Sequence, residues 1–144
     1  MITPEQCAAK FGQPNTKQVE SNLVLWDVPT ELEIGVIPKK IYCHKLMVEP
    51  LTKAFKSLIS TGAVKELKTW DGCYNRRLQR GSRTKWSIHS WGLAIDCNAA
   101  WNGLGKTPTF SKAFVKCFTD AGFDWGGNFG GSRVDGMHYQ LAAI

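Results

Sequence analysis

The most informative segment of this 144-residue chain is Ser87-Ile88-His89-Ser90-Trp91-Gly92-Leu93-Ala94-Ile95-Asp96. A fully extended chain would hold His89 and Asp96 about 23 Å apart, at roughly 3.3 Å per residue. The two side chains can share a site only if the chain bends, and Gly92 is the residue at which a bend costs least. We therefore expect a turn at Gly92, followed by a buried strand over 93–95 that delivers Asp96 at its end.

A carboxylate directly after a buried apolar strand needs a partner, because a lone buried charge is very costly. A zinc ion is one such partner, and a nearby arginine is the other. A second segment, Asp135-Gly136-Met137-His138, has the residue types of such a site. In an extended strand a spacing of three points two side chains to opposite faces, so Asp135 and His138 can share a site only through a turn at Gly136.

Two histidines and one carboxylate leave a fourth zinc position open for water, which is typical of catalytic rather than structural zinc sites. Spacings as loose as these are also common among unrelated loop and core residues, so the residues alone leave both interpretations open. The remaining histidine, His44, has no partner at ligand spacing, and we expect a structural or surface role for it.

Three helices are expected from periodicity and end signals. Apolar residues recur at offsets 0, 3, 4, 7 and 8 from Leu51, which predicts an amphipathic helix between Pro50 and Gly62. Thr3 followed by Pro4 predicts a helix start, with a stop at Gly12, and a third helix is expected over 111–121. Strands are expected at 23–28, 35–43, 64–74 and 137–141, with loops at 75–86, 98–109 and 123–131.

Composition favours one globular α+β domain spanning residues 1–144. Hydrophobic residues make up 43% of the chain, no run approaches the roughly 18 apolar residues of a membrane span, and the first residues lack the pattern of a secretory signal. The five cysteines are odd in number and lack a C-x-x-C pair, which favours buried, reduced thiols. A net charge of +6 favours an anionic partner or surface, such as nucleic acid, acidic lipid or an acidic cell wall.

The ordered pattern Ser87-x-His89-x-x-Gly92-x-Ala94-x-Asp96, followed by Asp135-x-x-His138, resembles the zinc peptidases of the VanY and VanX type. These are D-Ala-D-Ala carboxypeptidases and dipeptidases that share their fold with the hedgehog signalling domain. Segments 91–98, 123–127 and 135–139 are also similar to the L-alanyl-D-glutamate peptidases of bacteriophage endolysins. The resemblance covers roughly residues 68–141 and implies a small antiparallel sheet flanked by helices.

By this resemblance, one Zn²⁺ is held by His89, Asp96 and His138, and Asp135 is the general base that acts on the zinc-bound water. The family's Tyr-Arg-Pro segment aligns best with Arg77 at its arginine, although Arg76 stands at the tyrosine and Leu78 at the proline. The working arginine is therefore one of Arg76, Arg77 and Arg80. The residues expected to bind substrate are Arg77, Arg80, Ser87 and Trp125. Trp91, Trp125 and Tyr139 flank the site and belong either to the cleft wall or to the core.

The implied function is zinc-dependent hydrolysis of peptidoglycan stem peptides, first at the L-Ala to D-Glu bond and alternatively as a D-Ala-D-Ala carboxypeptidase. We expect a monomeric, phage-type endolysin without a separate cell-wall-binding domain, made in the host cytoplasm and acting on the wall after release. A cysteine peptidase or amidase, with Cys73 or Cys97 paired to His89, is a rival enzyme hypothesis. A basic nucleic-acid-binding module built on residues 76–85 is a rival from another class, but the chain has no recognisable binding motif, so no nucleic acid is expected.

Overall fold

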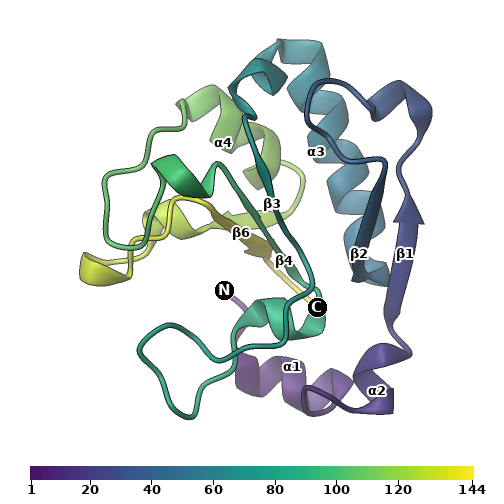
Figure 1. Cartoon of the computed structure of the whole chain (residues 1–144), viewed down its shortest axis with the longest axis vertical. Coiled ribbons are helices and arrows are strands. Elements are labelled where there is room, and N and C mark those ends of the chain that lie inside the picture. Colours follow the sequence, from purple (N-terminus) through teal and green to yellow (C-terminus); the bar gives the residue numbers. More distant parts are fainter.

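The computed structural model describes all 144 residues and shows a small α+β fold, which confirms the expected class (Figure 1). A two-stranded antiparallel sheet pairs β1 with β2, and a four-stranded antiparallel sheet has the order β3-β4-β6-β5. No helix is long and apolar enough to cross a membrane. The helices are α1 (Pro4–Phe11), α2 (Lys17–Glu20), α3 (Val48–Thr61) and α4 (Lys112–Thr119), and the strands are β1 (Leu23–Asp27), β2 (Lys40–His44), β3 (Trp70–Gly72), β4 (Ala94–Cys97), β5 (Phe123–Trp125) and β6 (His138–Leu141).

The three predicted helices are confirmed, with the expected end signals. Thr3 and Gln6 form a reciprocal capping box at the start of α1, in which each side chain accepts a hydrogen bond from the other residue's backbone N–H. Ser111 caps α4 by accepting a hydrogen bond of 3.1 Å from the Phe114 backbone N–H. Helix α3 ends at Gly62, whose φ of +79° lies in the left-handed region that glycine adopts readily.

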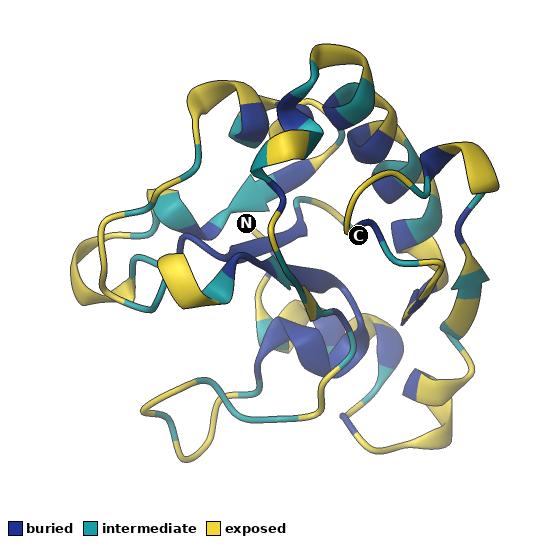
Figure 2. Ribbon diagram, turned by 45° about the horizontal axis from the view of Figure 1, so that its top comes forward, coloured by how far each residue is buried: buried dark blue, intermediate teal, exposed yellow.

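Helix α3 joins the two sheets through one aromatic side chain. Phe55 lies 6.2 Å from Trp26 of β1 and 5.7 Å from Trp70 of β3, measured between ring centroids. Both sheets therefore bury apolar side chains in a common core, and Figure 2 shows the central strands as buried and the outer faces of the helices as exposed. Trp91 and Tyr139 are fully buried in this core, so they are core residues rather than cleft walls.

Strand boundaries differ from the prediction in three places. The strand expected over 35–43 begins only at Lys40, after a turn in which Gly35 has a φ of +61°. The strand expected over 64–74 is reduced to β3, because the Asn98 side chain accepts hydrogen bonds from the Lys68 and Thr69 N–H groups and donates to the Glu66 carbonyl. The loop expected from residue 123 onward begins instead as β5, the edge strand beside β6.

His44 has the structural role expected for it. Its side chain is fully buried against Phe11, and its Nδ1 accepts a hydrogen bond of 3.0 Å from the Leu46 backbone N–H. Burial, aided by neighbouring Lys45, lowers the pKa of His44 to about 4, so the imidazole is neutral at physiological pH. The five cysteines are all free and buried, as predicted.

The predicted turn at Gly92 is confirmed and lies where the two sheets meet. Gly92 has a φ of +69°, and a Cβ atom there would lie 2.7 Å from the His44 backbone nitrogen and 2.8 Å from Leu23 Cδ2. The close approach allows the Gly92 carbonyl to accept a hydrogen bond of 3.0 Å from the His44 N–H. Glycine is therefore required at this position both for its backbone conformation and for its small size.

Replacing Gly92 should destabilise the protein more than replacing Gly62, although both have similar positive φ angles. Gly62→Ala should cost only the left-handed strain, roughly 1–2 kcal/mol, because no atom lies near the added methyl group. Gly92→Ala adds a collision with backbone, worth about 1–3 kcal/mol more. Urea unfolding of the two variants and the unchanged protein measures both terms. Equal losses of unfolding free energy would show that the contact with His44 is not tight.

Candidate metal centre

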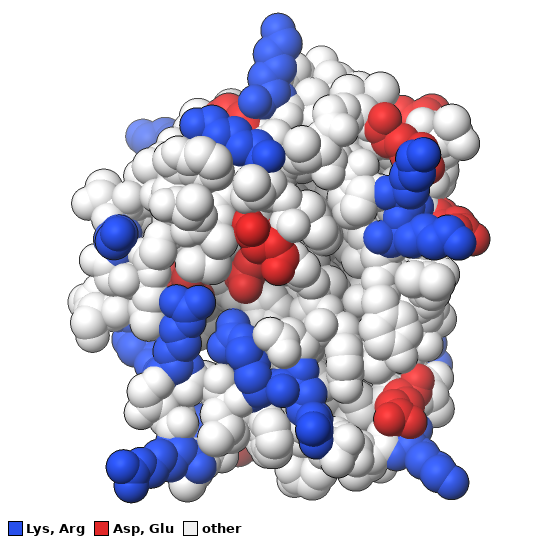
Figure 3. Space-filling model, in the orientation of Figure 1, with Lys and Arg blue, Asp and Glu red and all other residues white.

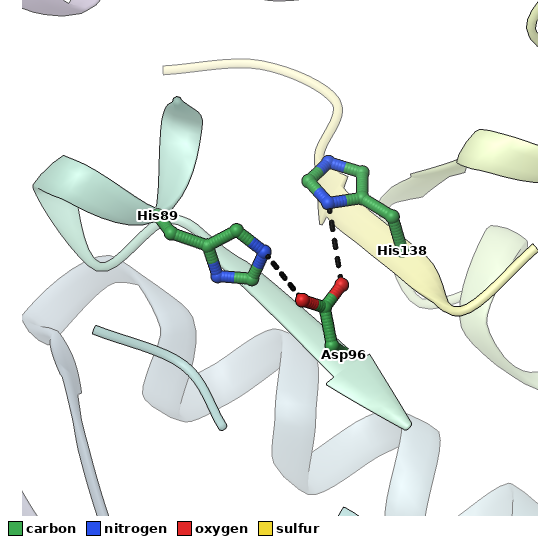
Figure 4. A group of neighbouring side chains, drawn as sticks. All are labelled: His89, Asp96 and His138. Carbon is green, nitrogen blue, oxygen red and sulfur yellow. Dashed lines mark ion pairs between the residues drawn. The ribbon is translucent and has the colours of Figure 1, made fainter. Parts of the chain in front are cut away.

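His89, Asp96 and His138 converge on one point beside the paired strands β4 and β6 (Figure 4). Asp96 of β4 and His138 of β6 are directly opposed across the antiparallel pair, and His89 lies in the short 3-10 turn Ile88–Trp91 that precedes β4. His89 Nε2 is 3.1 Å from Asp96 Oδ2, and His138 Nδ1 is 3.5 Å from Asp96 Oδ1. One ligand atom from each residue lies within 4.8 Å of the others.

The tautomers of both histidines follow from their other hydrogen bonds. His89 Nδ1 is 2.7 Å from the Cys73 carbonyl oxygen, which can only accept, so Nδ1 carries the proton and Nε2 carries a lone pair. His138 Nε2 is 2.9 Å from Gln140 Oε1, so His138 carries its proton on Nε2 and a lone pair on Nδ1. In its neutral form, each imidazole therefore directs a lone pair at the Asp96 carboxylate.

The three residues fit a divalent cation such as zinc. His89 Nε2 and Asp96 Oδ1 are buried without a hydrogen-bond partner, and Asp96 has no arginine or lysine within ion-pair distance. Lone pairs that face each other in a buried site repel unless a cation lies among them. Two imidazole nitrogens and one carboxylate oxygen form the donor set of catalytic zinc sites, in which one position stays open. Of the two partners considered for Asp96, the structure favours the metal over the arginine.

Asp96 is ionised in this setting. Burial by itself raises the pKa of its carboxyl group, but the neighbouring His138 and His89 lower that pKa by more, and it falls well below its ordinary value. The site therefore offers a charged oxygen ligand beside the two imidazoles.

Asp135 lies in the same cleft as Asp96 and His138. The predicted turn at Gly136 is confirmed, because the His138 N–H donates a hydrogen bond of 3.1 Å to the Asp135 carbonyl. The Asp135 N–H donates to the Gly126 carbonyl at 2.9 Å, and a Cβ atom on Gly126 would collide with the Asp135 carbonyl oxygen. Burial raises the pKa of the Asp135 carboxyl, and the opposing effect of His138 is smaller. A carboxylate with a raised pKa is a better proton acceptor than a solvated one.

Of the arginine and serine residues predicted to bind substrate, some line the cleft and one does not. Arg77 and Arg80 line the cleft, whereas Arg76 is exposed and does not. Ser87 also lines the cleft, and its hydroxyl accepts a hydrogen bond of 3.3 Å from the His89 N–H, so it caps the turn that carries the first ligand.

Trp125 lies outside the cleft that holds the three ligands. Its indole N–H donates a hydrogen bond of 2.8 Å to the Gly136 carbonyl, which steadies the turn before His138. It lines a neighbouring groove instead.

Sequence reasoning missed Arg133, which follows a glycine-rich segment and matches no motif. It lines the cleft, and its Nη2 donates a hydrogen bond of 3.1 Å to Gln79 Oε1. None of Arg77, Arg80 and Arg133 has an acidic side chain within ion-pair distance. Figure 3 shows basic side chains gathered on the lower part of one face, where the loop over 75–86 lies in Figure 1. Three guanidinium groups without acidic partners favour an anionic ligand.

The structure disfavours the thiol hypothesis. Cys73 Sγ is fully buried and donates a hydrogen bond to the Gly92 carbonyl, and Cys97 lies inside the central sheet. Burial raises the pKa of both thiols well above the ordinary value, so neither supplies a thiolate at neutral pH.

Comparison with known proteins supports the metal hypothesis. Residues 80–141 match the model of a family described as D-alanyl-D-alanine carboxypeptidase. The matched range includes His89, Asp96, Asp135 and His138 and excludes the N-terminal helices and the first sheet. No curated protein and no solved structure matches the chain. Over these residues the chain is similar to that family, and the match covers less than half of its length.

Zinc should bind with one ion per chain and stabilise the fold. At a free zinc concentration 100 times its Kd, the free energy of unfolding should rise by about 2.7 kcal/mol. His89→Ala and His138→Ala should remove this gain, whereas His44→Asn, which removes the third histidine, should keep it. Thermal unfolding with and without zinc tests all three variants. Equal stabilisation of the two ligand variants would place the ion elsewhere.

Proposed function

We propose that this chain is a zinc-dependent peptidase that hydrolyses the stem peptides of bacterial peptidoglycan, cutting the bond between L-Ala and D-Glu. One observation carries the proposal: His89 and His138 both face the ionised carboxylate of Asp96. The adjoining cleft also holds Asp135 and three arginines that have no acidic partner. The family match over residues 80–141 supports the coarser part of the proposal, a peptidase that acts on peptidoglycan.

Each part of the cleft has a role in amide hydrolysis. Bound zinc would supply a Lewis acid and lower the pKa of a coordinated water to about 7. Asp135 would accept the proton of the attacking water and return it to the leaving amine, which requires a carboxylate near the reacting atoms. The guanidinium groups of Arg77 and Arg80 would bind substrate carboxylates or stabilise the developing oxyanion. No residue of the cleft is needed as a covalent nucleophile.

The shape of the cleft favours an internal bond. The cleft adjoins the groove that Trp125 lines, and the two share Gln79, Ile88, Phe129, Arg133 and Gln140. Residues 1–4 form another part of the groove wall. We propose that substrate residues on the two sides of the cut bond occupy the cleft and this adjoining groove, as an endopeptidase requires. The D-Glu of a stem peptide also carries a free carboxylate, which matches the arginines.

We further propose a phage-type endolysin that acts as a monomer on the wall after release from the host cytoplasm, with residues 1–144 as its catalytic domain. The net charge of +6 supports this proposal, because it favours approach to an acidic envelope. A D-Ala-D-Ala carboxypeptidase is the second candidate, and the description of the matching family favours it.

Purified muropeptides and mass spectrometry distinguish the two candidates. Cleavage between L-Ala and D-Glu should release a peptide that begins with D-Glu, whereas a carboxypeptidase releases free D-alanine. Activity should be lost with EDTA, return with zinc and survive iodoacetamide. Intact stem peptides after incubation of the zinc-loaded protein would exclude peptidase function.

Asp135→Asn should lower kcat by about 10²- to 10⁴-fold, because the amide cannot accept the proton. Zinc should remain bound with a similar Kd, since Asp135 is not one of the three converging ligands. Steady-state kinetics together with zinc titration measure both quantities. Normal turnover by this variant would show that another group acts as the base.

Arg133→Gln should raise KM with little change in kcat if Arg133 binds a substrate carboxylate away from the cut bond. The matched control is Arg76→Gln, which removes the same charge from an exposed position outside the cleft. Measuring both variants at two salt concentrations separates local binding from the general attraction of a basic protein. Equal effects of the two substitutions would assign Arg133 to general attraction.

A further inference from the structure

We propose that the N-terminal segment is a working part of the metal centre, because the Ile2 carbonyl and the Gln140 side chain together hold His138 in the tautomer that can bind metal. The proposal rests on the zinc site described above and extends it to residues outside the matched family range. Gln140 is here a positioning residue that acts through His138.

The Gln140 side chain lies between the metal ligand and the start of the chain. Gln140 follows His138 by two positions on β6, so both side chains lie on the same face of the strand. Gln140 is 3% exposed and His138 is 7% exposed. The Gln140 Oε1 atom is 2.9 Å from His138 Nε2, and the Gln140 Nε2 atom donates a hydrogen bond of 3.2 Å to the Ile2 carbonyl oxygen.

The direction of these hydrogen bonds determines the tautomer. A backbone carbonyl can only accept, so Ile2 requires the amide nitrogen of Gln140 on its side and places the amide oxygen toward His138. An imidazole nitrogen that faces an oxygen acceptor must carry the proton. His138 Nδ1 is then left with the lone pair, 3.5 Å from Asp96 Oδ1. Such outer partners fix ring orientation and tautomer at metal sites in general.

The opposite orientation of the amide would compete with metal binding. If Gln140 presented its NH₂ group to His138, the ring would carry its proton on Nδ1, which faces the Asp96 carboxylate. That N–H would form a buried charge-assisted hydrogen bond to Asp96, which would stabilise the metal-free site. The Ile2 carbonyl therefore favours the metal-binding state by opposing this alternative.

The position of Ile2 is itself well determined. Its side chain is 7% exposed within the core, and the next residue, Thr3, forms the capping box of α1. The tautomer of His89 is fixed by a different hydrogen bond, to the Cys73 carbonyl, which does not involve the N-terminal segment. The two histidines therefore provide an internal comparison, because loss of the Gln140 contact should affect His138 alone.

The decisive experiment compares Gln140→Leu with Gln140→Glu. Leucine removes the acceptor for His138 Nε2, so zinc affinity should fall by about 10- to 100-fold. Glutamate keeps an acceptor at that position and should hold zinc affinity within a few-fold of the unchanged protein. The ¹⁵N chemical shifts of the metal-free protein, at a pH where His138 is neutral, should show His138 protonated on Nε2 in the unchanged and Glu forms and mixed in the Leu form. His89 should remain protonated on Nδ1 in all three.

Removal of residues 1 and 2 tests the role of the Ile2 carbonyl. The truncation should lower zinc affinity in the Gln140 protein but much less in the Gln140→Glu background, because a carboxylate needs no partner to orient it. Ile2→Ala is the matched control, since it removes the buried side chain, keeps the carbonyl and should keep the tautomer. If the truncated chain does not fold, the Gln140 pair decides the question.

Unchanged ¹⁵N shifts and zinc affinity in Gln140→Leu would overturn the proposal, as would equal losses in the Leu and Glu variants. The shifts are read without metal and without substrate. A protein that fails to bind zinc or to cut muropeptides would therefore refute the proposed function, while the tautomer of His138 would still be measured.

Discussion

The buried negative charge of Asp96 is the constraint on which the rest of the structure depends. A carboxylate inside a protein is normally neutralised by a cation or by several hydrogen-bond donors, because its desolvation otherwise costs several kcal/mol. Here the two nearest polar groups are imidazoles whose protons are held elsewhere, by the Cys73 carbonyl and by Gln140. The fold therefore gathers two imidazoles and a carboxylate in a small volume, and a divalent cation would balance this arrangement.

Close packing at three glycines holds the metal-binding residues in position, although their mutual contacts are unfavourable without a cation. Gly92 allows the turn that carries His89 to pack against the backbone of β2, and Gly126 allows its loop to pack against the carbonyl of Asp135. At Gly136 a Cβ atom would lie 2.9 Å from Asn102 Oδ1 and 2.9 Å from Pro108 Cβ. The nearest atoms at Gly92 and Gly126 belong to backbone, so the main chain positions the segments that carry His89 and Asp135, whereas Gly136 packs against side chains. Rigid support of this kind is what a metal site with fixed geometry needs.

Local chemistry explains which features were predictable from the sequence. The turns at Gly92 and Gly136 followed from the need to bring separated ligands together, and the helices followed from periodicity and caps. The extent of β3 was wrong because a single distant side chain, Asn98, satisfies the backbone of residues 66–69 in place of a strand partner. Substrate binding by Trp125 stays a prediction, and the sequence did not indicate that its indole N–H donates a hydrogen bond to the Gly136 carbonyl. Arg133 and Gln140 carry no local signal, since their contacts, with Gln79 and with Ile2, are with residues distant in the sequence.

The metal centre depends on residues from both ends of the chain as well as on its three ligands. The Ile2 carbonyl orients Gln140, Gln140 orients His138, and His138 faces Asp96, so a contact across almost the whole sequence controls which nitrogen is available to the ion. The same segment forms part of the groove that adjoins the cleft. Residues 1–4 therefore contribute to the site in two ways, through ligand orientation and through the groove wall. A change in this segment would alter metal binding and substrate contacts together, even though it leaves every ligand in the sequence intact.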